Sequence, residues 1–314
     1  MSARKPMPEG LPAAGFRVRD ARERGASRQR LERADLSAPF HGIRMRGSSA
    51  SFLDRCAALE VVFPEGSAFC GSTAARLWEL PLPLSASGIP FRVSSLRPTR
   101  ALRRRHVIGS ERGRWPAVRH HGVAVLDPVA TWITLARELE THDLTAVADR
   151  LISGTLRTPP LAGRADVERA LEEHGAGAGS RRLRRALADS RERAWSRPET
   201  LLRLLVGRAG LPEPQPNFET LAGGELAVID LAWPELRVGL EYDGRWHDRT
   251  PEQWASDARR RERLADAGWS VSHVRAEDLF GSPHAVVARL ARRLASAGHP
   301  TRTLDLTKLP RYEP

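Results

Sequence analysis

The feature that most constrains the fold is a strand–turn–strand pattern between Glu225 and Tyr242. Leu226–Leu231 is a short apolar run interrupted only by Asp230, which predicts a strand. Trp233, Pro234 and Glu235 predict a turn, and Leu236–Tyr242 predicts a returning strand. A chain with this pattern contains a sheet, and the sheet positions the residues that follow.

Two acidic residues lie on these predicted strands. Alternation predicts that Asp230 faces away from Ile229 and Leu231, and that Glu241 faces away from Leu240. Neighbouring strands would then bring the two carboxylates together. Carboxylate oxygens are ligands that Mg²⁺ prefers. The pair alone is more typical of surface charge, and the residues that follow it are needed to indicate a site.

The residues after the second strand add a histidine, an acid and a base. Asp243 and Gly244 predict a turn, so Asp243 is either a turn residue or a ligand. His247 either caps a loop or belongs to an active site. Thr250 predicts the start of a helix that carries Asp257 and Arg260 one turn apart. Arg260 either neutralises a phosphate or pairs with Asp257.

Helices flank this region on both sides. Ser196 and Glu199 form a predicted capping box, which gives Glu199 a structural role of its own. A further strand is predicted over Trp269–Arg275 and a last helix after Ser282. The predicted order of helix, strand, strand, helix, strand and helix indicates a small α/β layer.

The segment IDLAWPELRVGLEYDGRWH, with Asp257, Arg260, Leu264 and Gly268-Trp269 behind it, resembles the DUF559 family over about residues 195–297. That family is related to the very-short-patch repair endonucleases of the PD-(D/E)xK superfamily. The resemblance implies a restriction-endonuclease-like domain over 196–298 that hydrolyses DNA phosphodiester bonds with Mg²⁺. The site residues it implies are Glu199, Asp230, Glu241, His247 and Asp257.

Within this hypothesis, Asp230 and Glu241 hold Mg²⁺ with the Tyr242 carbonyl as a third ligand. His247 positions or deprotonates the attacking water, and Asp257 or Glu199 orients His247. The superfamily lysine is expected two residues after Glu241, where this chain has Asp243, and the chain's only lysines are Lys5 and Lys308. The site is therefore either histidine-assisted or an inactive fold that only binds DNA.

The first part of the chain resembles a DNA-binding module. Over 16–48, a short helix, Gly25, a second helix over 28–34 capped by Ser27, and a strand over 40–46 predict a winged helix-turn-helix. The alternative is a solvated basic helical hairpin. The second helix carries side chains suited to phosphates and base edges. These DNA-binding candidates are Arg28, Gln29, Arg30 and Arg33, with Arg260 in the other half.

Residues 50–155 predict a second, α+β unit that contains the segments STAARLW and LDPVATWITLA. With the winged helix, these segments resemble the antitoxins of abortive-infection type IV toxin–antitoxin systems (AbiEi) over about 16–155. The resemblance implies a transcription-regulating, DNA-binding module and a protein partner from a toxin–antitoxin pair.

The whole chain is therefore predicted to be a multidomain α/β protein. A flexible arm is expected over 1–15, a linker and basic helix over 156–195, and a C-terminal tail over 299–314. The basic helix at 180–195 either lines a DNA path or is a solvated connector. Residues 1–195 carry 33 Lys and Arg against 21 Asp and Glu, while 196–314 carry 17 of each, so the basic part is predicted to hold DNA. Without an apolar leader or a long apolar run, the sequence predicts a cytoplasmic protein without a membrane span.

Overall fold

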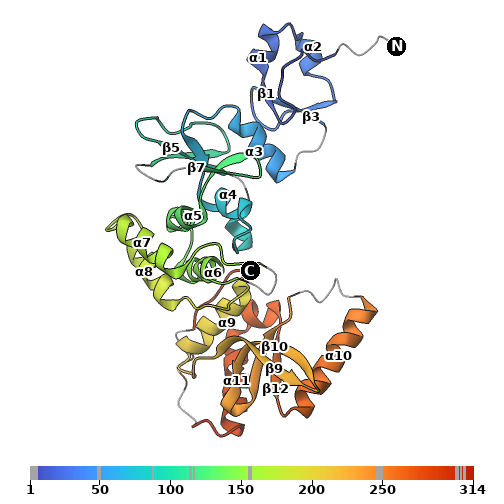
Figure 1. Cartoon of the computed structure of the whole chain (residues 1–314), viewed down its shortest axis with the longest axis vertical. Helices are drawn as coiled ribbons and strands as arrows, with labels where there is room; N and C mark the ends of the chain where they lie inside the picture. The colour runs from blue at the N-terminus through green and yellow to red at the C-terminus, as the bar shows by residue number, and fades with distance from the viewer. Residues whose placement is uncertain are drawn as a thin grey trace. The chain divides into compact units, whose positions relative to one another are not determined.

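The computed structural model describes residues 6–47, 51–86, 88, 90–112, 115, 117–154, 158–244, 250–300, 304, 306 and 309–314. Contacts divide the chain into two units. The N-terminal unit comprises Met1–Glu79 and Gly88–Thr134, and the C-terminal unit comprises Leu80–Ser87 and Leu135–Pro314. Helices and three sheets are distributed over the two units, which makes the chain a mixed α/β protein (Figure 1).

The N-terminal unit begins with a three-stranded sheet in the order β1-β3-β2, packed beside two short helices. Its elements are β1 (Phe16–Arg17), α1 (Val18–Glu23), α2 (Arg28–Leu31), β2 (Leu36–Ser37) and β3 (Ile43–Arg46). The predicted cap is confirmed, because the Ser27 hydroxyl accepts the Arg30 N–H. The predicted length of the second helix is wrong: it ends at Leu31, because the chain turns to reach β2.

A five-stranded sheet in the order β6-β5-β4-β8-β7 forms the rest of the N-terminal unit. Pairs β4/β5 and β7/β8 are antiparallel, while β4/β8 and β5/β6 are parallel. The elements are α3 (Phe52–Glu60), β4 (Ser67–Phe69), α4 (Gly71–Leu77), β5 (Phe91–Leu96), β6 (Val107–Arg112), β7 (Ala117–His120), β8 (Val123–Leu126) and α5 (Pro128–Leu135).

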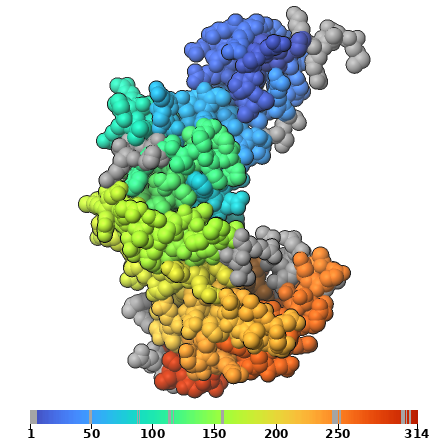
Figure 2. All heavy atoms as spheres, viewed as in Figure 1, coloured from blue at the N-terminus to red at the C-terminus, as the bar shows by residue number. Residues whose placement is uncertain are grey.

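Helices open the main part of the C-terminal unit: α6 (Thr141–Ile152), α7 (Arg164–His174), α8 (Ser180–Asp189) and α9 (Arg197–Arg208). The prediction of a linker before α8 is wrong in part, because α7 is a regular helix there. Its apolar residues Val167, Ala170 and Leu171 are buried. Helix α8 is also shorter than predicted and ends at Asp189. Figure 2 shows α7 and α8 in yellow-green on the surface.

A four-stranded sheet in the order β12-β11-β10-β9 forms the centre of this unit. Its strands are β9 (Gln215–Ala222), β10 (Glu225–Trp233), β11 (Val238–Tyr242) and β12 (Ser270–Val274). All pairs are antiparallel except β11/β12. Helices α9 and α11 (Pro283–Ser296) share one core with the sheet, and α10 (Pro251–Asp266) shares a second core on its other face (Figure 1).

The sequence predicts most of this layer correctly. The Thr250–Gln253 capping box begins α10, and Pro283 begins α11. Strand β9 is missing from the prediction because its burial pattern is weak and Pro216 lies within it. The finer domain division stays a prediction, although α6 groups with the sheet rather than with the N-terminal unit.

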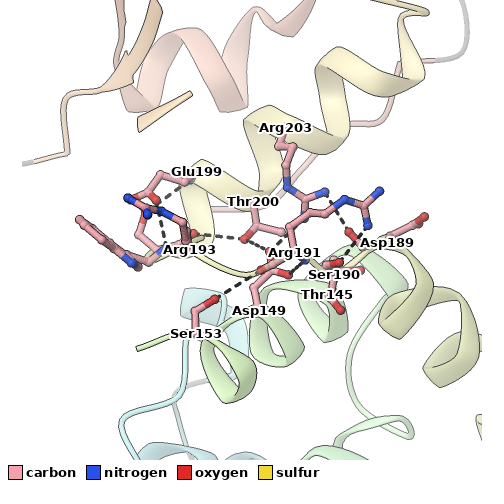
Figure 3. A network of polar contacts seen from close by, with 12 residues as sticks. Thr145, Asp149, Ser153, Asp189, Ser190, Arg191, Arg193, Glu199, Thr200 and Arg203 are labelled. Atoms are coloured by element: carbon pink, nitrogen blue, oxygen red, sulfur yellow. Dashed lines mark hydrogen bonds and ion pairs between the residues drawn. The ribbon is translucent and has the colours of Figure 1, made fainter. Parts of the chain in front are cut away.

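A buried ion-pair network fastens α6 to α9 (Figure 3). The Arg203 guanidinium donates to Asp149 at 3.0 Å, and both side chains are at most 4% exposed. The Thr200 hydroxyl and the Arg191 N–H also donate to Asp149, each at 2.7 Å. A second buried pair joins Arg197 to Asp143 at 2.8 Å. Despite its donors, burial raises the pKa of Asp149 to about 6.

None of the described helices is both long enough and apolar enough to cross a bilayer.

The ion pair leads to a stability prediction. Arg203→Met should lower the free energy of unfolding by about 3–5 kcal/mol at pH 8, because it leaves the Asp149 carboxylate buried without its guanidinium. Since the folded-state pKa of Asp149 already lies above its unfolded value, the loss should shrink as the pH falls to 5 and Asp149 takes up a proton. Urea denaturation at both pH values measures this difference. Adding Asp149→Asn should recover stability at pH 8, and a loss that is the same at both pH values would contradict the account.

Candidate functional site

The candidate site lies near the C-terminal ends of β11 and β12 and beside the middle of β10, where Arg260 of α10 reaches Glu241. The β10/β11 register pairs Leu231 with Leu240, so one further step brings Asp230 beside Glu241. The parallel β11/β12 register pairs Glu241 with His273. Asp230, Glu241 and His273 therefore lie near one another on three neighbouring strands. The predicted convergence of the two carboxylates agrees with this register.

The backbone is irregular at Asp230. The pairing of β10 with β9 and its pairing with β11 both leave out Asp230. Asn217, which lies opposite Asp230 on β9, has a left-handed φ of 44°. Ile229 packs in the α10-side core, whereas Leu231 packs in the core with α9 and α11. The prediction that these two residues share a face is therefore wrong, because the alternation of β10 changes phase at Asp230.

The free N–H of the next strand takes up the Asp230 side chain. The Tyr242 N–H donates to Asp230 Oδ2 at 2.8 Å, in place of a carbonyl of the sheet. Leu240 and Tyr242 contact the core with α9 and α11, and Glu241 points to the other face, as predicted. The acid pair thus lies at a point where β10 and β11 separate.

Glu199 is held as a structural acceptor beside this point. Its carboxylate accepts the Trp195 N–H at 3.0 Å, the Ser196 hydroxyl at 2.7 Å and the Asn217 amide at 2.6 Å. Glu199 is 8% exposed and Asn217 is 2% exposed. Sequence analysis did not single out Asn217, since only its left-handed backbone and its contact with Glu199 reveal its role.

Arg260 binds Glu241 through both guanidinium nitrogens. The distances are 3.1 Å from Nη1 to Oε2 and 2.5 Å from Nη2 to Oε1, and Nη2 also donates to the Val228 carbonyl. Burial has the largest single effect and lowers the pKa of Arg260, but the hydrogen bond and the charge of Glu241 oppose it, and the net shift is upward. Asp230 and Asp257 add smaller contributions. The main partner of Arg260 is thus Glu241, across the layers of the fold.

His273 is a second residue that sequence analysis missed. Its Nδ1 lies 3.4 Å from Asp243 Oδ2 and 3.7 Å from Glu241 Oε2. Arg261 approaches the same Asp243 oxygen at 3.6 Å. Burial lowers the pKa of His273 although both acids raise it. The available signal was a single histidine within a strand of serines and valines. Its neighbours could not be predicted without the parallel register.

Negative charge is incompletely balanced at Asp230. Burial raises its pKa to about 8, and the charges of Glu199 and Glu241 raise it as well. The Tyr242 N–H and Arg260 lower it by less. A carboxyl in this state holds a proton at neutral pH unless another cation arrives.

The described residues do not form a complete set of metal ligands. Among them, no group of three His, Cys, Asp or Glu side chains is arranged to hold a metal ion. Asp230 and Glu241 offer two carboxylates, and their oxygens fit the preference of Mg²⁺. His247 lies in the segment 245–249, outside the described residues.

The predicted DNA-binding residues on α2 and just after it fall into two groups. Arg28, Gln29 and Arg33 are exposed, and Arg28 forms only an exposed ion pair with Glu32. Arg30 is different, because it is 8% exposed and donates twice to Asp35 at 3.0 and 2.9 Å. Its guanidinium stabilises the turn after α2 and does not extend from the surface.

Comparison with known proteins finds relatives without an assigned function. The uncharacterised proteins MT2308 and Rv2248 of two Mycobacterium tuberculosis strains are each 28% identical over 253 residues, which cover 78% of this chain and 88% of the relative. No family model matches the chain. No solved structure matches it either.

The raised pKa of Asp230 predicts a pH dependence of stability. Because the folded state binds a proton that the unfolded state has lost, wild-type stability should fall as the pH rises from about 4 to 8, by at most about 1.4 kcal/mol per pH unit. Asp230→Asn should flatten this decline and be more stable at pH 8. Guanidinium denaturation in chelator measures both profiles.

The matched control is Asp266→Asn, since Asp266 is an exposed acid of α10. It should keep the wild-type profile. Parallel profiles for wild type and Asp230→Asn would contradict the charge imbalance at Asp230.

Proposed function

We propose that this protein binds DNA and hydrolyses its phosphodiester bonds with Mg²⁺, using a restriction-endonuclease-like domain built on the four-stranded sheet. The observation that carries this proposal is the convergence of Asp230 and Glu241 from neighbouring strands at a point with excess negative charge. A divalent cation there would remove the electrostatic cost that raises the pKa of Asp230.

The described residues support distinct roles in this chemistry. Bound Mg²⁺ would polarise a phosphate oxygen and lower the pKa of a water ligand. The Tyr242 N–H orients the Asp230 carboxylate, and the Tyr242 carbonyl stays a predicted ligand. Arg260 holds Glu241 and brings a guanidinium beside the acids, where it would stabilise negative charge on a bound phosphate.

The predicted catalytic roles of Glu199, His247 and Asp257 receive different degrees of support. The three donors on Glu199 support a structural role and leave its carboxylate little freedom to orient a catalytic group. The roles of His247 and Asp257 in handling the attacking water stay predictions. The resemblance to the DUF559 family is consistent with the order of α9, β10, β11, α10 and β12.

A second function is favoured by the same ion pair. Arg260 occupies both oxygens of Glu241, and the motif lysine is replaced by Asp243. An arginine in this position would balance part of the charge without a metal. The alternative is therefore an antitoxin-like transcriptional regulator whose nuclease fold binds DNA but does not cut it.

The N-terminal unit supports DNA binding under either function. Its small sheet β1-β3-β2 beside α1 and α2 is consistent with the proposed winged helix-turn-helix. Arg28, Gln29 and Arg33 are the exposed candidates for contacts to DNA. A partner from a toxin–antitoxin pair stays a prediction.

Plasmid nicking separates the two functions. Wild type should nick supercoiled plasmid in Mg²⁺ and not in chelator, and Asp230→Ala should reduce the rate by roughly 100-fold or more, since it removes a metal ligand. Asp266→Ala, which removes an exposed acid, should retain the wild-type rate. Absence of nicking, or equal nicking by wild type and Asp230→Ala, would favour the non-catalytic regulator.

DNA affinity tests the winged helix. Arg28→Ala/Arg33→Ala should weaken duplex binding by about tenfold and lower the slope of log K against log salt by about 2, because two phosphate contacts are lost. Fluorescence anisotropy over a range of KCl concentrations provides this slope. Arg19→Ala, on α1, is the control, since Arg19 lies beside Asp20 and Glu23. Binding that is unchanged after deletion of residues 1–50 would contradict this role.

A further inference from the structure

The C-terminal unit has a groove whose positive charge the proposed function has not used. This arginine groove has a volume of about 580 Å³. Its lining consists mainly of four arginines and two glycines: Arg137, Arg181, Arg182, Arg184, Gly177 and Gly179. All four arginines are exposed. The groove lies along the N-terminal half of α8, which is part of the surface seen in Figure 2.

The charge of the arginine groove is largely uncompensated. None of the described residues that line it is acidic. Arg184 donates to the Gly175 carbonyl at 2.9 Å, and Arg182 donates to the Leu139 carbonyl at 3.2 Å. The ion pair between Arg182 and Glu140 is long, at 3.8 Å. Backbone carbonyls therefore orient these guanidiniums while their charge remains available. The guanidiniums of Arg137 and Arg181 form no hydrogen bond or ion pair with another described residue.

A neighbouring hollow provides an internal comparison. It is lined by four arginines and two acids: Arg185 of α8, Arg191 between α8 and α9, Arg203 and Arg208 of α9, Asp189 and Glu213. There Arg185 pairs with Asp189 at 2.8 Å, and Arg191 pairs with Glu213 at 2.7 Å. An arginine-rich surface of this unit can therefore also contain the acidic residues that balance its charge. The imbalance is specific to the arginine groove.

Glycines give the groove its shape. Gly179 has a left-handed φ of 82°, and a Cβ there would lie 2.5 Å from the Cβ of Ala136. A Cβ on Gly177 would lie 2.4 Å from the His174 ring. The glycine-rich segment predicted to be a linker therefore packs closely against the chain before α6. It forms a wall without bulky side chains, which leaves the arginines accessible.

We propose that the arginine groove binds the phosphate backbone of duplex DNA, which gives the C-terminal unit its own DNA contact. This inference rests on the proposed DNA-directed function. Guanidinium groups match phosphate oxygens in geometry and charge. An acidic protein segment is the other polyanion, but its interface would need apolar anchors, and the groove lining is glycine, alanine, serine and arginine. The lining also has no aromatic ring on which single-stranded bases stack.

The test uses the full chain and a fluorescent DNA duplex. Arg137→Gln/Arg181→Gln removes the two arginines without described partners, so the fold and the melting temperature should be unchanged. Duplex affinity should fall by about tenfold and the slope of log K against log salt should decrease by about 2. Arg185→Gln, which breaks a balanced pair on the same helix, should change the affinity by less than about twofold.

Three results would overturn the proposal. Equal affinity and equal salt slope for wild type and the double variant would show that the groove does not contact DNA. Loss of polyglutamate binding with unchanged duplex binding would assign the groove to an acidic protein. Loss of single-stranded DNA binding with unchanged duplex binding would assign the groove to unpaired strands.

The failure of this proposal is separable from that of the proposed function. Nicking at saturating DNA depends on Asp230 and should be unchanged in Arg137→Gln/Arg181→Gln. If Asp230→Ala abolishes nicking but Arg137→Gln/Arg181→Gln leaves the duplex affinity unchanged, the nuclease proposal is supported and the groove proposal fails. If the double variant binds the duplex more weakly but the wild type never nicks plasmid, the groove proposal is supported and the nuclease proposal fails.

Discussion

The pair of Arg203 with Asp149 is the interaction on which the C-terminal unit depends. Both charges are removed from water, which costs several kcal/mol per ion unless each has close partners. Asp149 meets this cost with donors from Arg203, Thr200 and the Arg191 backbone. Because these groups come from α6, α9 and the segment between α8 and α9, the network fixes all three together. Apolar packing alone would allow α6 and α9 to slide.

Helix α9 transmits this constraint to the site. Arg197, Thr200 and Arg203 face α6 at helical spacing, while Leu201 and Leu205 face the sheet. Glu199 lies on the same helix and reaches Asn217 on β9. The left-handed Asn217 lies opposite Asp230, where β10 is irregular. A chain of contacts thus runs from the ion pair to Asp230, whose pKa is raised to about 8. The position of Asp230 is a consequence of tertiary packing as well as of strand alternation.

Local patterns in the sequence predicted what depends on neighbouring residues. Side chains of Ser27 and Thr250 cap their helices as the spacing indicates, and β10 and β11 pair around the Pro234 turn. Contacts between distant residues were not readable. The bidentate bond from Arg260 to Glu241 spans two layers, and His273 reaches the site only through a parallel register. Helix α7 was missed because glycine and proline near it outweighed its short apolar stripe.

The charge distribution along the chain is not the charge distribution of the fold. Sequence alone divides a basic part from a neutral part at residue 195, and this suggests that one part holds DNA and the other cuts it. The contacts, however, group α8 with the sheet that carries Asp230 and Glu241. An acidic cluster repels a phosphate backbone over roughly a Debye length, about 8–10 Å at physiological salt. A unit that brings such a cluster to DNA therefore benefits from uncompensated arginines of its own. The arginine groove offers that charge, while Arg260 is already engaged by Glu241.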